Sequence, residues 1–313
     1  MKVALLTGGR SLERGVSLRS GMRVADSLSG LGHEVVQLDL GPNLVSLLGE
    51  ARPDVAFIAL HGTEGEDGTI QALLELLDIP YTGPGVAACR LSADKDLTKH
   101  VLRRAGVRTP DWITYSEAEI RDFGAAATFA IATERLGLPV AVKPAAQGSS
   151  LGVRVVTGIE EMPDALMTAF SYGSSALVES WVSGRELAVS ILDGEVLPIV
   201  EAVPTESATY DFEARYEVGG ATFTCPARLS PEDEAAARAT ALAAYEALGC
   251  SEFSRVDLIL GKEGPSVLEV NAIPGLTETS LLPQAAEAAG VGFDDLIERL
   301  LEMAVVCKGP RSS

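Results

Sequence analysis

Residues 266–280 read SVLEVNAIPGLTETS, an apolar strand that runs directly into a turn. Because side chains alternate across a strand, Glu269 and Asn271 lie on the same face. The dipeptide Pro274-Gly275 then turns the chain sharply, and glycine lets a ligand approach the backbone closely. Two oxygen-bearing side chains on one face, followed by such a turn, indicate a ligand site at the end of this strand.

The segment before this strand supplies a third oxygen donor. Residues 254–260 read SRVDLIL, and the turn GKEG joins them to the next strand, so the two form an antiparallel pair that carries Asp257. Two carboxylates and an amide, with no histidine or cysteine nearby, suit Mg²⁺ or Mn²⁺ and not Zn²⁺. The solvated outer face of a half-buried sheet also carries Asp and Glu, so the pattern alone leaves both interpretations open.

Composition limits the class of protein. The chain has 313 residues, 47% of them hydrophobic, which is enough for two or three packed units. Its formal net charge of −19 argues against nucleic acid and against an anionic membrane surface as partners. A nucleotide remains compatible with this charge where the few cations converge and a divalent metal is present.

The cysteines and the N-terminus bear on the compartment. Four cysteines are scattered without a CxxC pair, which favours free thiols in a reducing compartment. The apolar run in MKVALLTGG is too short for a signal peptide, and no stretch approaches the roughly 18 apolar residues of a membrane span. We therefore expect a cytoplasmic protein.

The N-terminal third alternates apolar strands with a helix. The pattern predicts strands at 2–7, 34–38 and 54–60 and a helix at 16–31. This alternation predicts a parallel sheet, whose ligands gather at the carboxyl ends of its strands. Gly8-Gly9 follows the first of these strands and His61-Gly62 follows the third, so they are expected to face one site.

Beyond the N-terminal third, the sequence pattern changes to hairpins and isolated helices. A helix is predicted at 93–105, a strand at 136–144 and hairpins beyond residue 176, one of them turning at Asp193-Gly194. The helix predicted at 230–248 begins with Ser230 as its N-cap. The sequence thus predicts one parallel α/β unit followed by two mixed, mostly antiparallel units.

Three further sites have two interpretations each. Lys143 lies in a strand before the loop AAQGSSLG, whose amides and hydroxyls suit a phosphate; a surface hairpin is the alternative. His61 is either a ligand contact or a satisfied histidine at a strand end. Glu13 either meets an ammonium group or complements a helix dipole. The loop GGRSLERG lacks GxGxxG, so an NAD-dependent oxidoreductase is disfavoured.

Eight segments in order cover nearly the whole chain: GGRSLERGVSLRSG, HGTEGEDGTIQ, IPYTG, LPVAVKPAAQGSSLGV, GRELAVSIL, YDFEARY, RVDLIL and LEVNAIPGLTETSLLP. Together they resemble the ATP-grasp superfamily and, within it, the D-alanine–D-alanine ligase family. The resemblance implies an N-terminal parallel α/β domain at 1–92 and two mixed α+β domains, at 93–180 and 181–313, that grip ATP between them. It also implies a lid loop at 204–224 and a homodimer.

The resemblance assigns expected roles to residues. Metal ligands for two Mg²⁺ ions, or Mn²⁺, are expected at Asp257, Glu269 and Asn271. Contacts to ATP are expected from Lys95, Lys143, Ser149, Glu179, Val182, Glu186 and Arg215. Contacts to the two D-alanines are expected from Glu13, His61, Ser280 and Leu281. Catalytic roles are expected for Glu13, Ser149, Tyr216, Arg255 and Gly275.

The resemblance implies ATP-dependent ligation of two D-alanines through an acylphosphate, with release of ADP and phosphate, for peptidoglycan precursor synthesis. Ligation of D-alanine to another D-amino acid or D-hydroxy acid is the alternative, and Tyr216 favours an amine as the nucleophile. A non-catalytic nucleotide sensor would have little reason to retain the whole set of expected ligands. Three positions depart from the family pattern: Gly15, Gln147 and Arg215.

Overall fold

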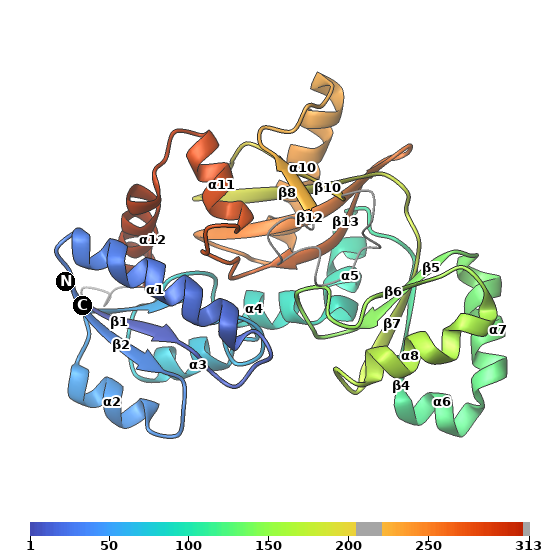
Figure 1. Ribbon diagram of the computed structural model, residues 1–313, viewed down its shortest axis with the longest axis horizontal. Coiled ribbons are helices and arrows are strands. Elements are labelled where there is room, and N and C mark those ends of the chain that lie inside the picture. Colours follow the sequence, from blue (N-terminus) through green and yellow to red (C-terminus); the bar gives the residue numbers. More distant parts are fainter. Residues whose placement is uncertain (205–220, 309–313) are drawn as a thin grey trace.

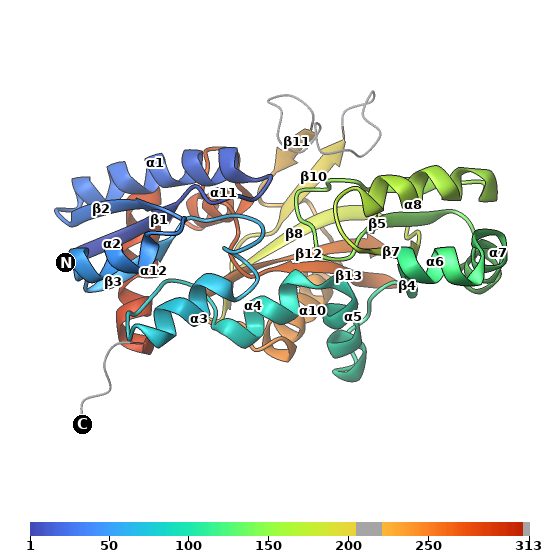
Figure 2. The same cartoon turned by 90° about the horizontal axis from the view of Figure 1, so that it is seen from below.

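A computed structural model gives the structure of residues 1–204 and 221–308. Three sheets follow one another along the chain, one of them parallel and two antiparallel. In Figures 1 and 2 the third sheet lies between the other two. This confirms the predicted order of one α/β unit followed by two mostly antiparallel units. Within the described residues, no helix is long and apolar enough to cross a membrane.

The first sheet is parallel, with strand order β2-β1-β3. Its apolar central strand is buried from Val3 to Leu6, as a strand covered on both faces must be. Helix α1 packs along the sheet, and its buried positions recur at a helical spacing. The elements are β1 (Lys2–Thr7), α1 (Arg14–Gly30), β2 (Glu34–Asp39), α2 (Leu44–Ala51), β3 (Val55–Ile58) and α3 (Thr69–Leu76).

Two consecutive helices connect the first unit to the second. Helix α4 (Val86–Ala93) ends before Asp94, and α5 (Lys95–Arg104) begins after it. Asp94 is the N-cap of α5, because its carboxylate accepts hydrogen bonds from two amides of the first turn. The helix predicted to begin at residue 93 therefore begins at Lys95. Both helices contact β13 of the third sheet.

The second sheet has strand order β4-β7-β5-β6 and is antiparallel. Helix α8 packs on β5, β6 and β7, and a separate hydrophobic core joins them. The elements are β4 (Trp112–Ser116), α6 (Glu117–Phe123), α7 (Ala125–Leu136), β5 (Val140–Pro144), β6 (Arg154–Val156), η1 (Ile159–Glu161), α8 (Met162–Phe170) and β7 (Ser175–Ser180).

The third sheet has strand order β11-β10-β8-β12-β13, with β9 paired to β8. Alternation along β8 separates its faces: Leu187, Val189 and Ile191 pack with α10, whereas Ala188 and Leu192 belong to the core of the first unit. The elements are β8 (Arg185–Leu192), β9 (Glu195–Val196), β10 (Val200–Pro204), β11 (Ala221–Thr224), α10 (Pro231–Ala247), β12 (Phe253–Gly261) and β13 (Gly264–Asn271).

Local sequence signals for the third unit are confirmed. The predicted hairpin turn at Asp193-Gly194 joins β8 to β9, and both turn residues have positive φ angles. The Ser230 hydroxyl accepts a hydrogen bond from the Asp233 amide at 3.1 Å, with proline in the first turn of α10.

The C-terminal helices return to the first unit. Helices α11 (Leu281–Ala288) and α12 (Phe293–Lys308) follow the third sheet in sequence. Helix α12 nevertheless packs against α1 and β3, and its buried face shares the core of the N-terminal strands. The sheets fall within the predicted ranges 1–92, 93–180 and 181–313, while the division of the chain into domains at these residues stays a prediction.

Candidate active site

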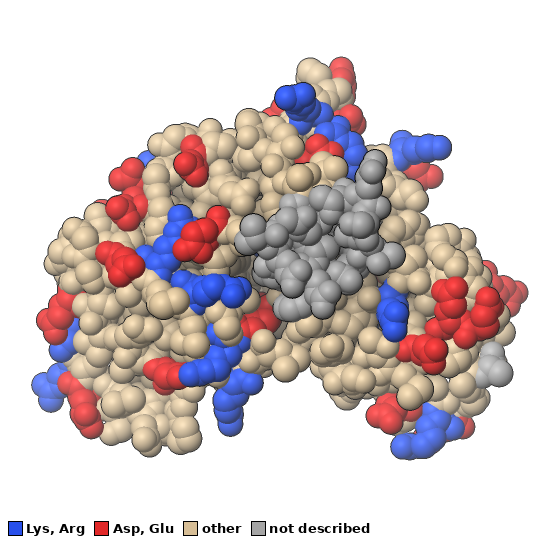
Figure 3. All heavy atoms as spheres, viewed as in Figure 1, with Lys and Arg blue, Asp and Glu red and all other residues tan. Residues whose placement is uncertain are grey.

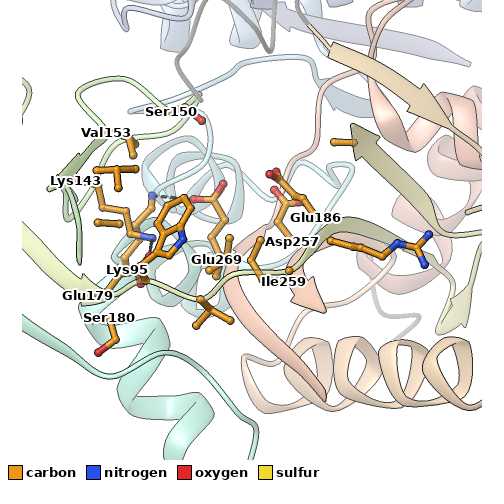
Figure 4. A pocket seen from close by; sticks show the side chains of 18 of the residues that line it. Lys95, Lys143, Ser150, Val153, Glu179, Ser180, Glu186, Asp257, Ile259 and Glu269 are labelled. Carbon is orange, nitrogen blue, oxygen red and sulfur yellow. Dashed lines mark hydrogen bonds and ion pairs between the residues drawn. The ribbon is translucent and has the colours of Figure 1, made fainter. Parts of the chain in front are cut away.

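A cavity of about 440 Å³ lies between the second and third sheets. One wall comes from the second sheet and the other from the third, as Figure 4 shows. Among the residues expected to contact ATP, Glu179, Val182 and Glu186 line this cavity. A space of this size between two sheets accommodates a ligand as large as a nucleotide.

The third-sheet wall carries the oxygen donors. Asp257 pairs directly with Glu269, and Arg255 with Asn271, so all four side chains share one face of the hairpin. Arg255 donates to both oxygens of Asp257, at 2.7 Å and 2.9 Å. The Asn271 amide donates to Asp257 Oδ2 at 3.1 Å. The antiparallel pairing predicted from the sequence is confirmed.

The donor set fits a hard divalent ion. Asp257 and Glu269 line the cavity and offer carboxylate oxygens, and Asn271 adds an amide oxygen. Within the described residues no three His, Cys, Asp or Glu side chains cluster as a metal site. An ion held here would complete its shell with water and ligand phosphates, which is the habit of Mg²⁺ and Mn²⁺.

The opposite wall carries lysines. Lys143 on β5 donates to Glu179 Oε1 at 2.6 Å. Lys95, at the start of α5, lies 3.0 Å from Glu269 Oε2 and donates to the Gln147 carbonyl at 2.7 Å. Both lysines are buried, and Figure 4 shows Lys95 reaching Glu269. Buried ammonium groups beside an open cavity favour an anionic ligand.

A fully buried lysine backs this wall. Lys99 contacts Glu179 Oε2 at 2.9 Å, so the Glu179 carboxylate lies between two ammonium groups. Burial lowers the pKa of Lys99 to about 8. Although burial opposes it, the charges of Lys143 and Lys99 lower the pKa of Glu179. Sequence reasoning missed Lys99, because a lone lysine on a helix is usually solvated.

The loop after β5 has an uncommon backbone. Ser149 and Ser150 have φ angles of 56° and 54°, in the left-handed region that non-glycine residues rarely adopt. Strained conformations of this kind concentrate at ligand sites. Ser150 lines the large cavity. The hydroxyl of buried Ser149 donates a hydrogen bond to Glu13, the N-cap residue of α1.

Glu13 is a buried carboxyl with unused hydrogen-bonding capacity. Its Oε2 has no hydrogen-bond partner among the described residues. Burial, followed by the nearby negative charge of Glu66, raises its pKa to about 7. A cationic group placed beside Glu13 would reverse this shift, so the site is suited to an ammonium group.

A second cavity of about 260 Å³ adjoins the first. Lys95, Gln147 and Glu269 line both cavities. The second is also lined by Gly62 and Gly148, and a Cβ on either would come within 3.3 Å of Glu13 Oε2 or closer. A small amino acid therefore fits beside Glu13 and next to the nucleotide-sized space.

His61 and the turn after β13 both contact α1, each through Ser20. The ring of buried His61 contacts Ser20 on α1 at 2.9 Å and Glu66 at 3.2 Å. A Cβ on Gly275 would meet the Ser280 hydroxyl at 2.7 Å, so a larger residue there would have to displace that hydroxyl. Ser280 precedes α11 and accepts a hydrogen bond from the Thr277 amide at 3.0 Å, and half-buried Leu281 begins that helix.

Other predicted residues lie elsewhere. Arg215 and Tyr216, with most of the predicted lid at 204–224, lie outside the described residues. Gly15 is exposed in the first turn of α1, and nothing lies within 4 Å of a Cβ built there. Trp181 lines the large cavity and was not singled out from the sequence, although it directly precedes Val182.

Two family models match this chain. The family model described as D-ala D-ala ligase C-terminus matches residues 101–302, and the one described as D-ala D-ala ligase N-terminus matches residues 43–84. A D-alanine--D-alanine ligase of Pelotomaculum thermopropionicum is 43% identical, with 97% of both chains covered. One of Moorella thermoacetica is 42% identical, with 97% of this chain and 99% of its own covered.

Solved structures agree. The crystal structure of D-alanine--D-alanine ligase from Bacillus anthracis complexed with ATP gives a TM-score of 0.85 at 32% identity, covering 98% of both chains. A ligase from Coxiella burnetii gives a TM-score of 0.81 at 27% identity, covering 98% of this chain and 94% of its own.

The cavity lies between two antiparallel sheets, with lysines on one wall and carboxylates on the other. This arrangement defines an ATP-grasp protein. The C-terminal family model alone matches more than half of the chain. The chain belongs to the D-alanine–D-alanine ligase family.

Proposed function

We propose that the protein joins two D-alanines to D-alanyl-D-alanine at the expense of ATP, releasing ADP and phosphate. The observation that carries the proposal is the cavity between the two antiparallel sheets, with Lys143 on one wall and Asp257 and Glu269 on the other. The adjoining smaller cavity beside Glu13 supports an amino acid substrate. Membership of the family supplies the substrate class.

The phosphoryl half of the reaction uses the two walls. A carboxylate oxygen of the first D-alanine forms a bond to the γ-phosphorus, the bond to the bridging oxygen of ADP breaks, and an acylphosphate results. Lys95 and Lys143 stabilise the negative charge on the phosphoryl oxygens. Asp257, Glu269 and Asn271 would hold Mg²⁺ or Mn²⁺, which supplies additional charge neutralisation when bound.

The ligation half uses the turn after β13. The neutral amine of the second D-alanine forms a bond to the acylphosphate carbonyl carbon, and phosphate leaves with its bonding electron pair and takes up the proton that the amine loses. Arg255 and the Gly275 amide are proposed to stabilise the negative oxygen, and Ser280 and Leu281 to bind the acceptor. Loss of one such donor typically costs about 3 kcal/mol in the barrier.

The remaining roles complete the proposal. Ser149, Glu179, Val182 and Glu186 are proposed to contact ATP, while Glu13 and His61 are proposed to serve the first D-alanine. From the family membership we also propose that the protein acts in the cytoplasm as a homodimer and that its product is used for peptidoglycan synthesis. Gel filtration with light scattering measures the oligomeric state directly.

One assay tests the function. We expect ADP release with Mg-ATP and D-alanine, matched one-to-one by D-alanyl-D-alanine in the mass spectrum. D-lactate, D-serine and L-alanine serve as controls for the acceptor. Absence of turnover with D-alanine, or turnover only with another acceptor, contradicts the proposal.

A separate titration tests the metal ligands. Asp257→Asn is expected to raise the Mg²⁺ concentration needed for half-maximal activity by about tenfold or more, since even outer-shell partners of a metal site matter this much. Asp294→Asn, in the first turn of α12, is the matched control and should leave the Mg²⁺ dependence unchanged.

A further inference from the structure

Ser20 occupies a junction that the proposed roles do not explain. Its side chain is fully buried on α1, between the first sheet and the turn after β13. The hydroxyl lies 2.9 Å from His61 Nε2, and it accepts a hydrogen bond from the Leu276 amide at 3.3 Å. One hydroxyl thus contacts His61, which is proposed to serve the first D-alanine, and the peptide that follows Gly275.

The donor and the acceptor in each hydrogen bond of the series Glu66–His61–Ser20–Leu276 follow from the chemical groups present. A carboxylate only accepts, so His61 Nδ1 donates its hydrogen to Glu66 Oε1 at 3.2 Å. In a neutral imidazole the other nitrogen, Nε2, then accepts. The Ser20 hydroxyl donates to it, which leaves its oxygen to accept from the Leu276 amide.

This assignment gives His61 a fixed tautomer. Both ring nitrogens are engaged, one by Glu66 and one by Ser20. The ring is buried, so an unpaired nitrogen would lose hydrogen bonding to water without replacement. Glu66 accepts the hydrogen at Nδ1 and the Ser20 hydroxyl stabilises Nε2 as the acceptor, so the two partners together set the tautomer.

Helix α1 holds the same turn at a second point. Arg23, three residues after Ser20, donates to the Thr277 carbonyl at 2.9 Å and to the Leu276 carbonyl at 3.3 Å. Its guanidinium also lies 3.6 Å from the centre of the Phe293 ring. Residues three apart lie on one helical face, so the two side chains grip successive peptides of the turn.

We propose that Ser20 is a positioning residue that couples the first substrate site to the acceptor site. Its hydroxyl, together with Glu66, sets the His61 tautomer, and it holds the peptide after Gly275, so that the Gly275 amide points at the reacting carbonyl. This inference rests on the proposed function for the roles of His61 and Gly275. Arg23 supports the same turn from its carbonyl side.

Nuclear magnetic resonance of the histidine side chains tests the tautomer in the complete protein. The chain has three histidines, so ¹⁵N signals are assigned with single substitutions of His33 and His100. We expect wild-type His61 to be protonated at Nδ1, and Ser20→Ala to lose that pure tautomer. Protonation at Nε2 in the wild type, or an unchanged spectrum in Ser20→Ala, overturns the proposal.

Steady-state kinetics test the coupling. Ser20→Ala is expected to lower kcat/KM for D-alanine about tenfold or more, with KM for ATP within about twofold of wild type. A fall in ATP affinity equal to that for D-alanine would indicate a general structural defect and contradict a positioning role.

Ser17→Ala is the matched control. Ser17 is equally buried on α1, accepts from the Gly8 amide at 2.9 Å and donates to the Ala59 carbonyl at 2.7 Å. Its loss is expected to lower stability while leaving the His61 tautomer intact. If Ser17→Ala changes the tautomer as Ser20→Ala does, the proposal fails.

Two safeguards keep the test decisive. If Ser20→Ala does not fold, Arg23→Ala, at a half-buried position, is expected to raise KM for D-alanine severalfold with KM for ATP unchanged. Unchanged kinetics in Arg23→Ala then contradict the proposal. If the wild type makes no dipeptide, the proposed function fails, whereas the tautomer measurement still decides the role of Ser20.

Discussion

Glu13 shows how one buried carboxyl depends on its surroundings. Burial and the negative charge of Glu66 raise its pKa to about 7, while the Ser149 hydroxyl and His61 act in the opposite direction. Glu269 adds a smaller unfavourable charge. The carboxyl therefore changes its charge within the physiological range, in a cavity proposed to hold an ammonium group.

Substrate affinity is predicted to follow this charge. KM for D-alanine in the wild type should fall as pH rises from about 6 to 8, because the ammonium binds the charged form of Glu13. Glu13→Gln should have a higher KM without this break in its pH dependence. Initial rates across pH with saturating ATP measure the effect, and an identical profile in both proteins would show that Glu13 does not titrate on binding.

The raised pKa of Glu13 also makes the stability of the folded protein depend on pH. A carboxyl whose pKa rises from 4.5 to about 7 on folding favours the folded state at low pH. This contribution is complete below the unfolded pKa and is lost as pH rises through the folded value. Glu13→Gln should therefore gain stability relative to wild type between about pH 5 and 8, as measured by urea unfolding.

At the scale of elements, α5 and β7 meet through buried charges. Lys99 on α5 donates to the Thr109 hydroxyl at 2.8 Å and to the Pro110 carbonyl at 3.0 Å, besides its contact with Glu179 on β7. These bonds satisfy an ammonium group that has no access to water. Lys99 balances the Glu179 charge, which leaves Lys143 a net attraction for phosphate.

Removing Lys99 should weaken nucleotide binding. Lys99→Met is predicted to raise the Kd for ATP about tenfold or more, because Glu179 then pairs with Lys143 alone. The double variant Lys99→Met, Glu179→Gln should recover part of the lost ATP affinity, since Lys143 no longer has Glu179 as its partner and again attracts phosphate. Calorimetry of ATP binding and urea unfolding provide the readouts. Wild-type ATP affinity in Lys99→Met would refute the charge-balance argument.

Elements fixed by interactions between residues close in sequence were predictable, whereas contacts between distant residues were not. The hairpin that bears Asp257 and Glu269 was predictable, because alternation and a short turn fix its register locally. The start of α5 was misplaced by two residues, since Asp94 interrupts a continuous helical pattern. Contacts such as Ser20 with Leu276 join residues 256 apart, and no local pattern encodes them.

At the scale of the whole molecule, chain order and packing diverge. Helix α12 follows the third sheet but packs on the first, so both ends of the chain share one hydrophobic core. In Figure 1 the N-terminus and α12 lie at the same side of the molecule. Figure 3 shows acidic and basic side chains interspersed over this side of the visible face.

A buried ion pair joins three parts of the molecule. Lys308, at the end of α12, donates to the Tyr81 carbonyl at 2.9 Å and also contacts the Gly83 carbonyl and the Glu252 carboxylate. Glu252 accepts a further hydrogen bond from the Gly83 amide at 2.7 Å. Burial raises the pKa of Glu252 despite the nearby charge of Lys308, so this carboxylate depends on its partner.

Breaking this pair is predicted to loosen the first unit from the third. Lys308→Met leaves Glu252 buried without its cation, which should lower the free energy of unfolding by about 3 kcal/mol. Lys308→Met combined with Glu252→Gln should recover much of the loss, whereas Lys262→Met in the exposed turn of the β12–β13 hairpin should have no effect. Urea unfolding monitored by circular dichroism measures all three. Equal stability of Lys308→Met and the Lys262→Met control would show that α12 is held by its apolar face alone.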